Sequence, residues 1–363
     1  MKKKIFTLLQ IIVTVALLWW VFHDSVKREQ IFRAIWGADK LWCLAAIASY
    51  GVVELLAAVR WWILLRVQNV HLGWWRVVRL LMIGIFFNLF MPGGTGGDVI
   101  KSYFLLKETP GKKGPALLAV LMDRLLGLIG LIVVSGLVIY WRWDWLTEGK
   151  QFPPLHPLWI FIPSKMLAWM SQIPNTVKLL YTLLLILGFS ISGIVFSFLV
   201  TGFNLAHRLP KKMPARDQII DLSIAYSQYA KAWPQSVAAM VISFGVHIGS
   251  FLVFYYAALA LHMKAAIMDF LAIMPIINTI AAMPFNVGGL GAREGMFQEM
   301  LGSLCGVPAS TAVATSLLGY AVLAFWAFVG GIIYITYRPS EHARISEMNR
   351  EVHRVEHEIA EQK

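Results

Sequence analysis

The feature of this sequence that most constrains its fold is the length of its apolar blocks. Each is long enough, or nearly so, for the ~20 residues that a helix needs to cross a bilayer. Charged residues make up only 14% of the 363 positions, against roughly 25% in an ordinary globular protein. This composition predicts an all-α integral membrane protein and excludes a soluble enzyme. Six predicted transmembrane helices cover residues 5–22, 41–65, 115–140, 179–201, 235–261 and 310–337.

Two further apolar segments, residues 77–91 and 269–283, are too short to cross a bilayer alone. At 1.5 Å per residue each spans ~22 Å, whereas the hydrocarbon core is ~30 Å thick. Each segment ends in Met-Pro and a glycine cluster, and a second short helical stretch follows. We therefore predict two re-entrant helical hairpins, over residues 77–106 and 269–305. Irregular backbone at this depth needs protein or a water-filled cavity to satisfy its polar groups.

The positive charges indicate how the chain crosses the membrane. A net charge of +12 could suggest a nucleic-acid partner, but most Lys and Arg fall in segments on one predicted side. These segments are residues 2–4, 66–113, 202–234 and the C-terminal tail. The positive-inside rule assigns that side to the cytoplasm, so both termini are expected there. The first apolar block lacks a small-residue cleavage site, and we expect it to be retained.

The order of the predicted elements repeats along the chain. Residues 1–140 contain span, span, hairpin, span, and residues 179–337 contain the same order, but the two hairpins enter from opposite sides. An external loop rich in Trp and Pro, residues 141–178, separates these inverted halves, and a charged helical tail, residues 338–363, follows. Both hairpin tips contain Met-Pro, then Gly-Gly-x-Gly, then an acid. Matching tips in inverted halves indicate a transporter's central site, and we expect them to meet near the midplane.

The two tips carry the residues of the predicted binding site. Glycine lets backbone approach a ligand closely, and the helix that follows directs unpaired N–H groups towards the membrane interior, where a phosphate headgroup would fit. Neither a metal ion nor a cofactor is expected. The predicted binding residues are Gly93, Gly94, Gly96, Gly97, Asp98, Lys101, Asp123, Arg124, Gly288, Gly289, Gly291, Arg293 and Glu294.

The charged members of this set also have a structural interpretation. Asp98 and Glu294 follow the glycine runs, where a carboxylate can cap a helix N-terminus or pair with a nearby cation. Asp123 and Arg124 are adjacent in one predicted span and point about 100° apart, so each needs its own partner on another helix. Arg124 either binds the phosphate of a cargo lipid or joins an ion pair that fixes helix packing.

Three other features within the spans are expected to serve anchoring or packing. Arg60, beside Trp61 near a span end, is expected to extend to the membrane interface, with Trp61 in an aromatic belt. Gly245 and Gly249 form a GxxxG pattern, which is typical of close helix packing. His247 lies between them and is expected to be a hydrogen-bonded core histidine.

Three stretches of the sequence resemble the signature of a known membrane family. FFNLFMPGGTGGDVIKSYFL, MDRLLGLIGL and MPFNVGGLGAREGMF resemble the lysylphosphatidylglycerol synthase transmembrane-domain family, the flippase-like module of the multiple peptide resistance factor. The resemblance covers nearly the whole chain to about residue 337. It implies a multi-pass protein of the bacterial inner membrane that moves lipids between leaflets.

The resemblance also implies site residues. Relatives often carry arginine where this chain has Lys101, which makes a bidentate phosphate grip there less expected. The segment after residue 337 is too short for a soluble aminoacyl-transferase domain, so the chain is not expected to synthesise the lipid. The positions that match the family's motifs are Asp98, Asp123, Arg124, Arg293 and Glu294.

The sequence therefore predicts a transporter or flippase-like protein that moves an anionic, phosphate-bearing lipid by alternating access. It contains no GxxxxGK[ST] motif, which leaves downhill scrambling or ion coupling as the driving force. One alternative is an intramembrane transferase acting on a lipid phosphate, with Asp98 or Asp123 as base and Mg²⁺ on carboxylates. The other is a membrane scaffold for a partner enzyme. Expected partners are membrane lipids with anionic headgroups, no nucleic acid, and a possible second copy through a heptad stripe in the tail.

Overall fold

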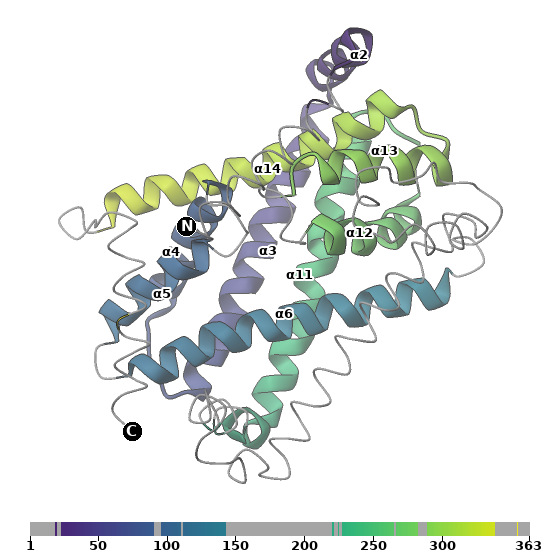
Figure 1. Ribbon diagram of the computed structural model, residues 1–363. Helices are drawn as coiled ribbons and strands as arrows, with labels where there is room; N and C mark the ends of the chain where they lie inside the picture. The colour runs from purple at the N-terminus through teal and green to yellow at the C-terminus, as the bar shows by residue number, and fades with distance from the viewer. Residues whose placement is uncertain are drawn as a thin grey trace, which may run out of the picture. The chain divides into compact units, whose positions relative to one another are not determined.

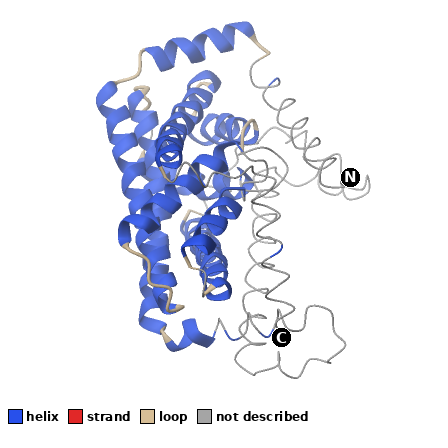
Figure 2. Cartoon of the chain, turned by 90° about the vertical axis from the view of Figure 1, so that its left-hand side faces the viewer, coloured by secondary structure: helices blue, strands red, loops and turns tan. Residues whose placement is uncertain are grey.

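The structure, a computed structural model, describes residues 23–90, 96–109, 112–142, 227–264, 266–281 and 289–337, with single positions 19, 220, 224 and 354. These residues form helices and loops, and no strand occurs among them (Figures 1 and 2). The helices are α2 (Ser25–Trp36), α3 (Lys40–Val67), α4 (Trp74–Phe90), α5 (Gly96–Glu108), α6 (Lys113–Trp141), α11 (Trp233–Ala260), α12 (Ile267–Ala281), α13 (Ala292–Cys305) and α14 (Ala309–Thr336).

Four of these helices are long and apolar enough to cross a membrane, namely α3, α6, α11 and α14. They coincide with the spans predicted at 41–65, 115–140, 235–261 and 310–337, as expected of an α-helical membrane protein. The spans predicted at 5–22 and 179–201 lie outside the described residues. The same holds for nearly all of the external loop and of the tail.

Helix α2 is an element that the sequence analysis did not predict. Asp24 begins it, because its carboxylate accepts a hydrogen bond from the Val26 N–H at 2.9 Å, as an N-cap residue does. Its buried face is short: Ile31 packs against Val313 and Ala314 of α14. With Ile31 as the one buried residue among its described side chains, this charged 12-residue helix shows no clear apolar period. Its contact with α14, rather than a hydrophobic pattern in the sequence, therefore identifies it.

Each segment predicted as a hairpin contains two short helices in contact. Helices α4 and α5 pack side by side (Figure 1), and they run antiparallel because Arg76 at the start of α4 contacts Glu108 at the end of α5. Helices α12 and α13 also contact each other. The tips between the paired helices, residues 91–95 and 282–288, lie outside the described residues.

The chain forms two compact units. Unit 1 comprises residues 1–46, 132–191 and 251–320, and contains α2 and the α12–α13 hairpin. Unit 2 comprises residues 47–131, 192–250 and 321–363, and contains the α4–α5 hairpin. The core of unit 2 is apolar and aromatic: Trp61, Leu80, Ile83 and Phe104 are all at most 1% exposed. This core holds the α4–α5 hairpin against α3 and α6.

Candidate functional site

The start of α5 lies against α4 through contacts that require glycine. The N–H of Gly97 donates to Oδ1 of Asn88 on α4 at 2.8 Å. A Cβ at Gly97 would overlap the carbonyl oxygen of Gly84, so only glycine lets α5 start this close to α4. Gly96 and Gly97 are both buried. The predicted binding residues Gly93 and Gly94 lie outside the described residues.

Directly after these glycines, charged side chains from α3, α5 and α6 come together in what we call the α5 charge cluster. Both Arg124 and Lys101 contact the same atom, Oδ1 of Asp98: the Arg124 Nη2 at 2.6 Å and the Lys101 Nζ at 3.5 Å. The Lys101 Nζ also lies 3.8 Å from Oδ2 of Asp123. The cluster consists of Arg60, Asp98, Lys101, Asp123 and Arg124.

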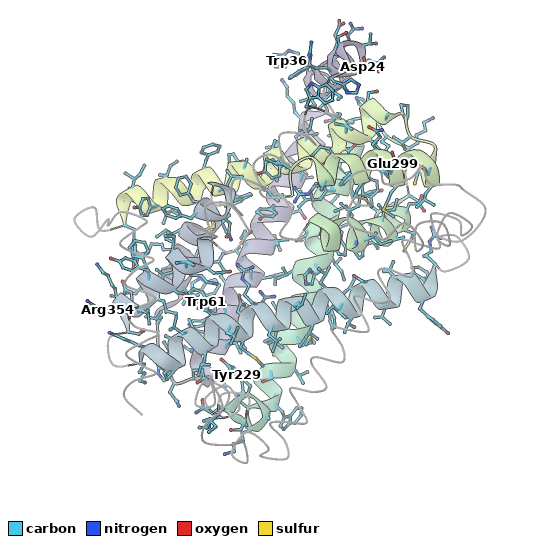
Figure 3. All side chains as sticks on the ribbon, in the orientation of Figure 1. Asp24, Trp36, Trp61, Tyr229, Glu299 and Arg354 are labelled. Atoms are coloured by element: carbon cyan, nitrogen blue, oxygen red, sulfur yellow. The ribbon has the colours of Figure 1, made fainter. Side chains whose placement is uncertain are left out.

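Arg60 does not extend to the membrane interface, and that prediction was wrong. Its Nε lies 2.8 Å from Oδ1 of Asp123, its Nη1 donates to Oγ of Ser243 at 3.0 Å, and the residue is 8% exposed. Trp61 is fully buried rather than part of an aromatic belt (Figure 3), and the Lys101 Nζ lies 4.4 Å from its ring centre. Asp123 and Ser243 supply partners inside the unit, so the guanidinium does not need water.

Asp123 and Arg124 have separate partners, which confirms the prediction from their 100° separation. Asp123 pairs with Arg60 and Lys101, whereas Arg124 pairs with Asp98. The two sides of the cluster differ in exposure. The Arg60 and Asp123 side chains are 9% and 6% exposed, but the Arg124 side chain is 53% exposed. One side is therefore a buried ion pair, and the other remains accessible.

A third carboxyl, that of Glu54 on α3, belongs to the surroundings of this cluster. It is hydrogen-bonded to Tyr50 and interacts electrostatically with Arg124, Arg60 and Lys101. The three cations Arg60, Lys101 and Arg124 thus have three acidic neighbours. These are the directly paired carboxylates of Asp98 and Asp123 and the nearby carboxyl group of Glu54. Within the described part of the chain, no three His, Cys, Asp or Glu side chains are grouped as they would be to hold a metal ion.

Beside the cluster, helix α11 packs closely against α3 through Gly245 and Gly249, as their GxxxG pattern predicted. A Cβ on Gly249 would come within 2.6 Å of the Val53 side chain, and one on Gly245 within 3.4 Å of Leu56, so α11 lies close against α3. His247 is hydrogen-bonded through Nε2 to the carbonyl oxygen of Gly127 at 2.8 Å. Close packing and a bonded core histidine are both confirmed.

In unit 1, the start of α13 is built around Glu294. Gly289 and Gly291 have φ of 79° and 80°, a region that favours glycine. The Glu294 carboxylate accepts the Gly291 N–H at 2.6 Å and the Ser316 hydroxyl at 2.8 Å, and the residue is fully buried. The capping interpretation of Glu294 is therefore confirmed. Gly288 lies outside the described residues.

Arg293, the neighbour of Glu294, is bound differently. Its Nε and Nη1 atoms are buried and have no hydrogen-bond partner in the part of the chain that the structure describes. Its Cζ lies 5.7 Å from the ring centre of Phe254 and 5.4 Å from that of Tyr320. No carboxylate of the described residues in unit 1 forms an ion pair with it. Two aromatic rings hold this cation, and they leave its charge uncompensated.

Three residues of these sites were not predicted as such: Asn88, Ser243 and Ser316. Each makes one specific hydrogen bond to a functional group, at Gly97, Arg60 and Glu294 respectively. Asn88 and Ser243 are single polar residues in otherwise apolar stretches, whereas Ser316 follows Thr315. For Asn88 and Ser243, that isolation is the signal from which they could have been identified, because a polar group inside a membrane helix needs a partner.

Comparison with known proteins agrees with the resemblance carried by the three sequence stretches. The family model described as lysylphosphatidylglycerol synthase TM region matches residues 7–331. A UPF0104 membrane protein of Pyrococcus horikoshii is 24% identical over 343 residues, which cover 93% of this chain and 98% of the relative. No solved structure matches the chain. This multi-pass membrane protein belongs to the family defined by the lysylphosphatidylglycerol synthase transmembrane region.

Proposed function

We propose that this protein moves an anionic, phosphate-bearing lipid between the leaflets of the membrane. The observation that carries the proposal is the shared contact of Lys101 and Arg124 with one carboxylate oxygen of Asp98. Charged side chains within membrane helices are costly and usually mark pathways or binding sites. Two cations that face a single carboxylate at the end of a glycine-rich tip can accept another anion.

The charges of the cluster favour Asp98 as the group that a phosphate displaces. Arg60 is matched by Asp123 in the buried pair. Lys101 and Arg124 then share Asp98, and the Lys101 contact is the longer of the two. The two charged oxygens of a headgroup phosphodiester can replace the two carboxylate oxygens of Asp98, and Arg recognises phosphate with two parallel hydrogen bonds. Arg124 is the first contact because its side chain is half exposed.

Arg293 is the proposed anion-binding group of unit 1. Two guanidinium nitrogens of Arg293 are buried without a hydrogen-bond partner among the described residues, which is unfavourable, so a counter-ion is expected during part of the working cycle. Glu294 does not fill this role, because both of its carboxylate oxygens accept hydrogen bonds elsewhere. A phosphate or carboxylate of the cargo is the proposed partner. The remaining predicted binding residues, the tip glycines, are proposed to let the headgroup approach backbone N–H groups.

The hairpins are proposed to be re-entrant and to belong to an inverted repeat. Their helices, of 17, 13, 15 and 14 residues, extend ~20–26 Å and are shorter than the ~30 Å hydrocarbon core. Alternating access of the two inverted halves would then expose the site to each leaflet in turn. We further propose cytoplasmic termini, from the distribution of Lys and Arg, and the bacterial inner membrane as the location.

Lipid movement in vesicles tests the proposal directly. The purified protein is reconstituted into vesicles that contain headgroup-labelled phosphatidylglycerol, and a membrane-impermeant reductant bleaches the label in the outer leaflet. Bleaching beyond the outer-leaflet share, dependent on protein and unaccompanied by chemical change of the lipid, is the expected result. Bleaching that stops at the outer-leaflet share would contradict transport. Covalent conversion of the lipid would instead support the transferase.

A further inference from the structure

A second charged region of unit 2 lies away from the α5 charge cluster, at the end where four helices meet. Helix α3 ends at Val67, α4 begins at Trp74, α5 ends at Glu108 and α6 begins at Lys113. The two connecting loops touch, since the Lys112 amino group donates to the Asn69 carbonyl oxygen. Because α3 and α6 are both long enough to cross a membrane, this end lies at the boundary between membrane and water.

Basic side chains surround this end and form what we call the basic collar. Glu108 is the single carboxylate among the described residues of segments 66–79 and 102–116. It is already engaged, because it pairs with Arg76 at 2.8 Å and accepts the Tyr337 hydroxyl. The collar consists of Arg66, Arg76, Arg79, Lys107, Lys112 and Lys113, all exposed except the half-buried Lys113.

Aromatic rings, rather than acids, hold three of these cations in place. The Arg66 Cζ lies 3.7 Å from the ring centre of Trp62, and the Arg79 Cζ lies 5.4 Å from that of Tyr337. The Lys107 Nζ lies 5.0 Å from the ring centre of Tyr103. A ring orients a cation without cancelling its charge. Among the described residues of these two segments, the collar therefore carries more positive than negative charge.

We propose that the basic collar binds the anionic headgroups of phospholipids in the leaflet where α3 and α6 end. Trp75 is 70% exposed beside the collar, and Trp62 and Trp74 pack edge to face at 6.0 Å. Tryptophan next to basic residues is the composition found at the headgroup level of a membrane. A lipid surface therefore fits this patch better than an acidic protein does. The inference does not depend on the transport proposal.

Spin-label measurements of lipid selectivity test this inference. The protein is reconstituted in phosphatidylcholine vesicles with a trace of spin-labelled phosphatidylglycerol or spin-labelled phosphatidylcholine, and the motionally restricted fraction is measured. The wild type is expected to restrict the anionic lipid several-fold more, with a preference that falls as salt is added. The variant R66Q/R79Q/K107Q/K112Q is expected to lose most of this preference and to restrict the two lipids nearly equally.

A matched control removes the same charge elsewhere. Arg28, Arg33, Lys40 and Lys264 are exposed residues of unit 1, and R28Q/R33Q/K40Q/K264Q should retain most of the preference. If the collar variant does not reconstitute, R66Q/K107Q replaces it and should lose part of the preference. Equal restriction of both lipids by the wild type would overturn the inference, and so would equal losses in the collar and control variants.

Discussion

The guanidinium of Arg60 and the carboxylate of Asp123 form a buried ion pair, with Nε 2.8 Å from Oδ1 and side-chain exposures of 9% and 6%. The same guanidinium bonds Ser243, so one side chain connects α3, α6 and α11 within unit 2. Lys101 and Arg124, only a few ångströms further along the cluster, share Asp98 instead. The cluster therefore combines a buried pair, Arg60–Asp123, with the pair Arg124–Asp98, in which the Arg124 side chain is accessible. The two pairs should respond differently to substitution.

The buried pair should be critical for stability. Asp123→Leu leaves Arg60 buried and unpaired, and should lower the free energy of unfolding by about 3–5 kcal/mol. The double variant R60M/D123L should be more stable than Asp123→Leu alone. Unfolding of the detergent-solubilised variants by heat or by denaturant measures the difference in their free energies of unfolding. The exposed pair Arg33–Glu29 is the control, and Glu29→Gln should cost less than about 1 kcal/mol. A stable Asp123→Leu variant would show that the pair is not structural.

Arg124 should matter for transport and hardly for stability. Its side chain is 53% exposed, so Arg124→Gln should cost less stability than Asp123→Leu, which breaks a pair that is buried on both sides. Phosphatidylglycerol movement in vesicles should nevertheless fall by at least about ten-fold, the effect of roughly 1.4 kcal/mol on binding. Arg124→Lys should restore only part of it, because lysine lacks the planar fork. A Gln variant as active as the wild type, at equal reconstitution, argues against phosphate binding here.

Asp98 should compete with the cargo for its cations. In Asp98→Asn, Lys101 and Arg124 lose the carboxylate that they share. The variant should therefore bind an anionic headgroup more tightly and release it more slowly. Titration with short-chain phosphatidylglycerol should give a lower dissociation constant, while the transport rate in vesicles falls. Weaker binding by Asp98→Asn would mean that Asp98 holds the cations in the binding geometry instead.

Arg293 gives a prediction about the sign of a stability change. Its buried Nε and Nη1 have no partner, so replacing it by the apolar Met should leave stability unchanged or raise it. Lipid movement should decrease if Arg293 binds the cargo anion. Thermal unfolding and the vesicle assay are measured on the same preparation. A clear loss of stability in Arg293→Met would indicate that the contacts with Phe254 and Tyr320 are structural.

Gly97 should tolerate no side chain. A Cβ there would overlap the Gly84 carbonyl oxygen and approach the Asn88 side chain, and overpacking of this kind costs about 1–3 kcal/mol. Gly97→Ala should therefore destabilise the protein and reduce transport. Gly114→Ala is the matched control, because nothing lies within 4 Å of a Cβ at that position. It should be neutral or stabilising, since alanine favours helix over glycine. Similar stabilities of the two variants would contradict this packing.

The elements of this fold could be predicted where the signal is local. Apolar length predicted the helices α3, α6, α11 and α14, and the shorter apolar segments that end in Met-Pro and glycines predicted α4 and α12. The divergence of Asp123 and Arg124 followed from helix geometry alone. Helix α2 was missed because its apolar face is limited to one fully buried residue, Ile31.

The sequence by itself determined that this is a helical membrane protein with short helices next to its glycine runs, because segment length and helical period are properties of neighbouring residues. Tertiary structure decided which charges are structural. Arg60 and Asp123 are 63 residues apart, and nothing in the spacing brings them together. From the sequence, Glu294 could have been a binding residue. In the structure, the Ser316 hydroxyl and the Gly291 N–H donate hydrogen bonds to its two carboxylate oxygens. A buried charge takes the partner that packing supplies, and packing depends on the whole chain.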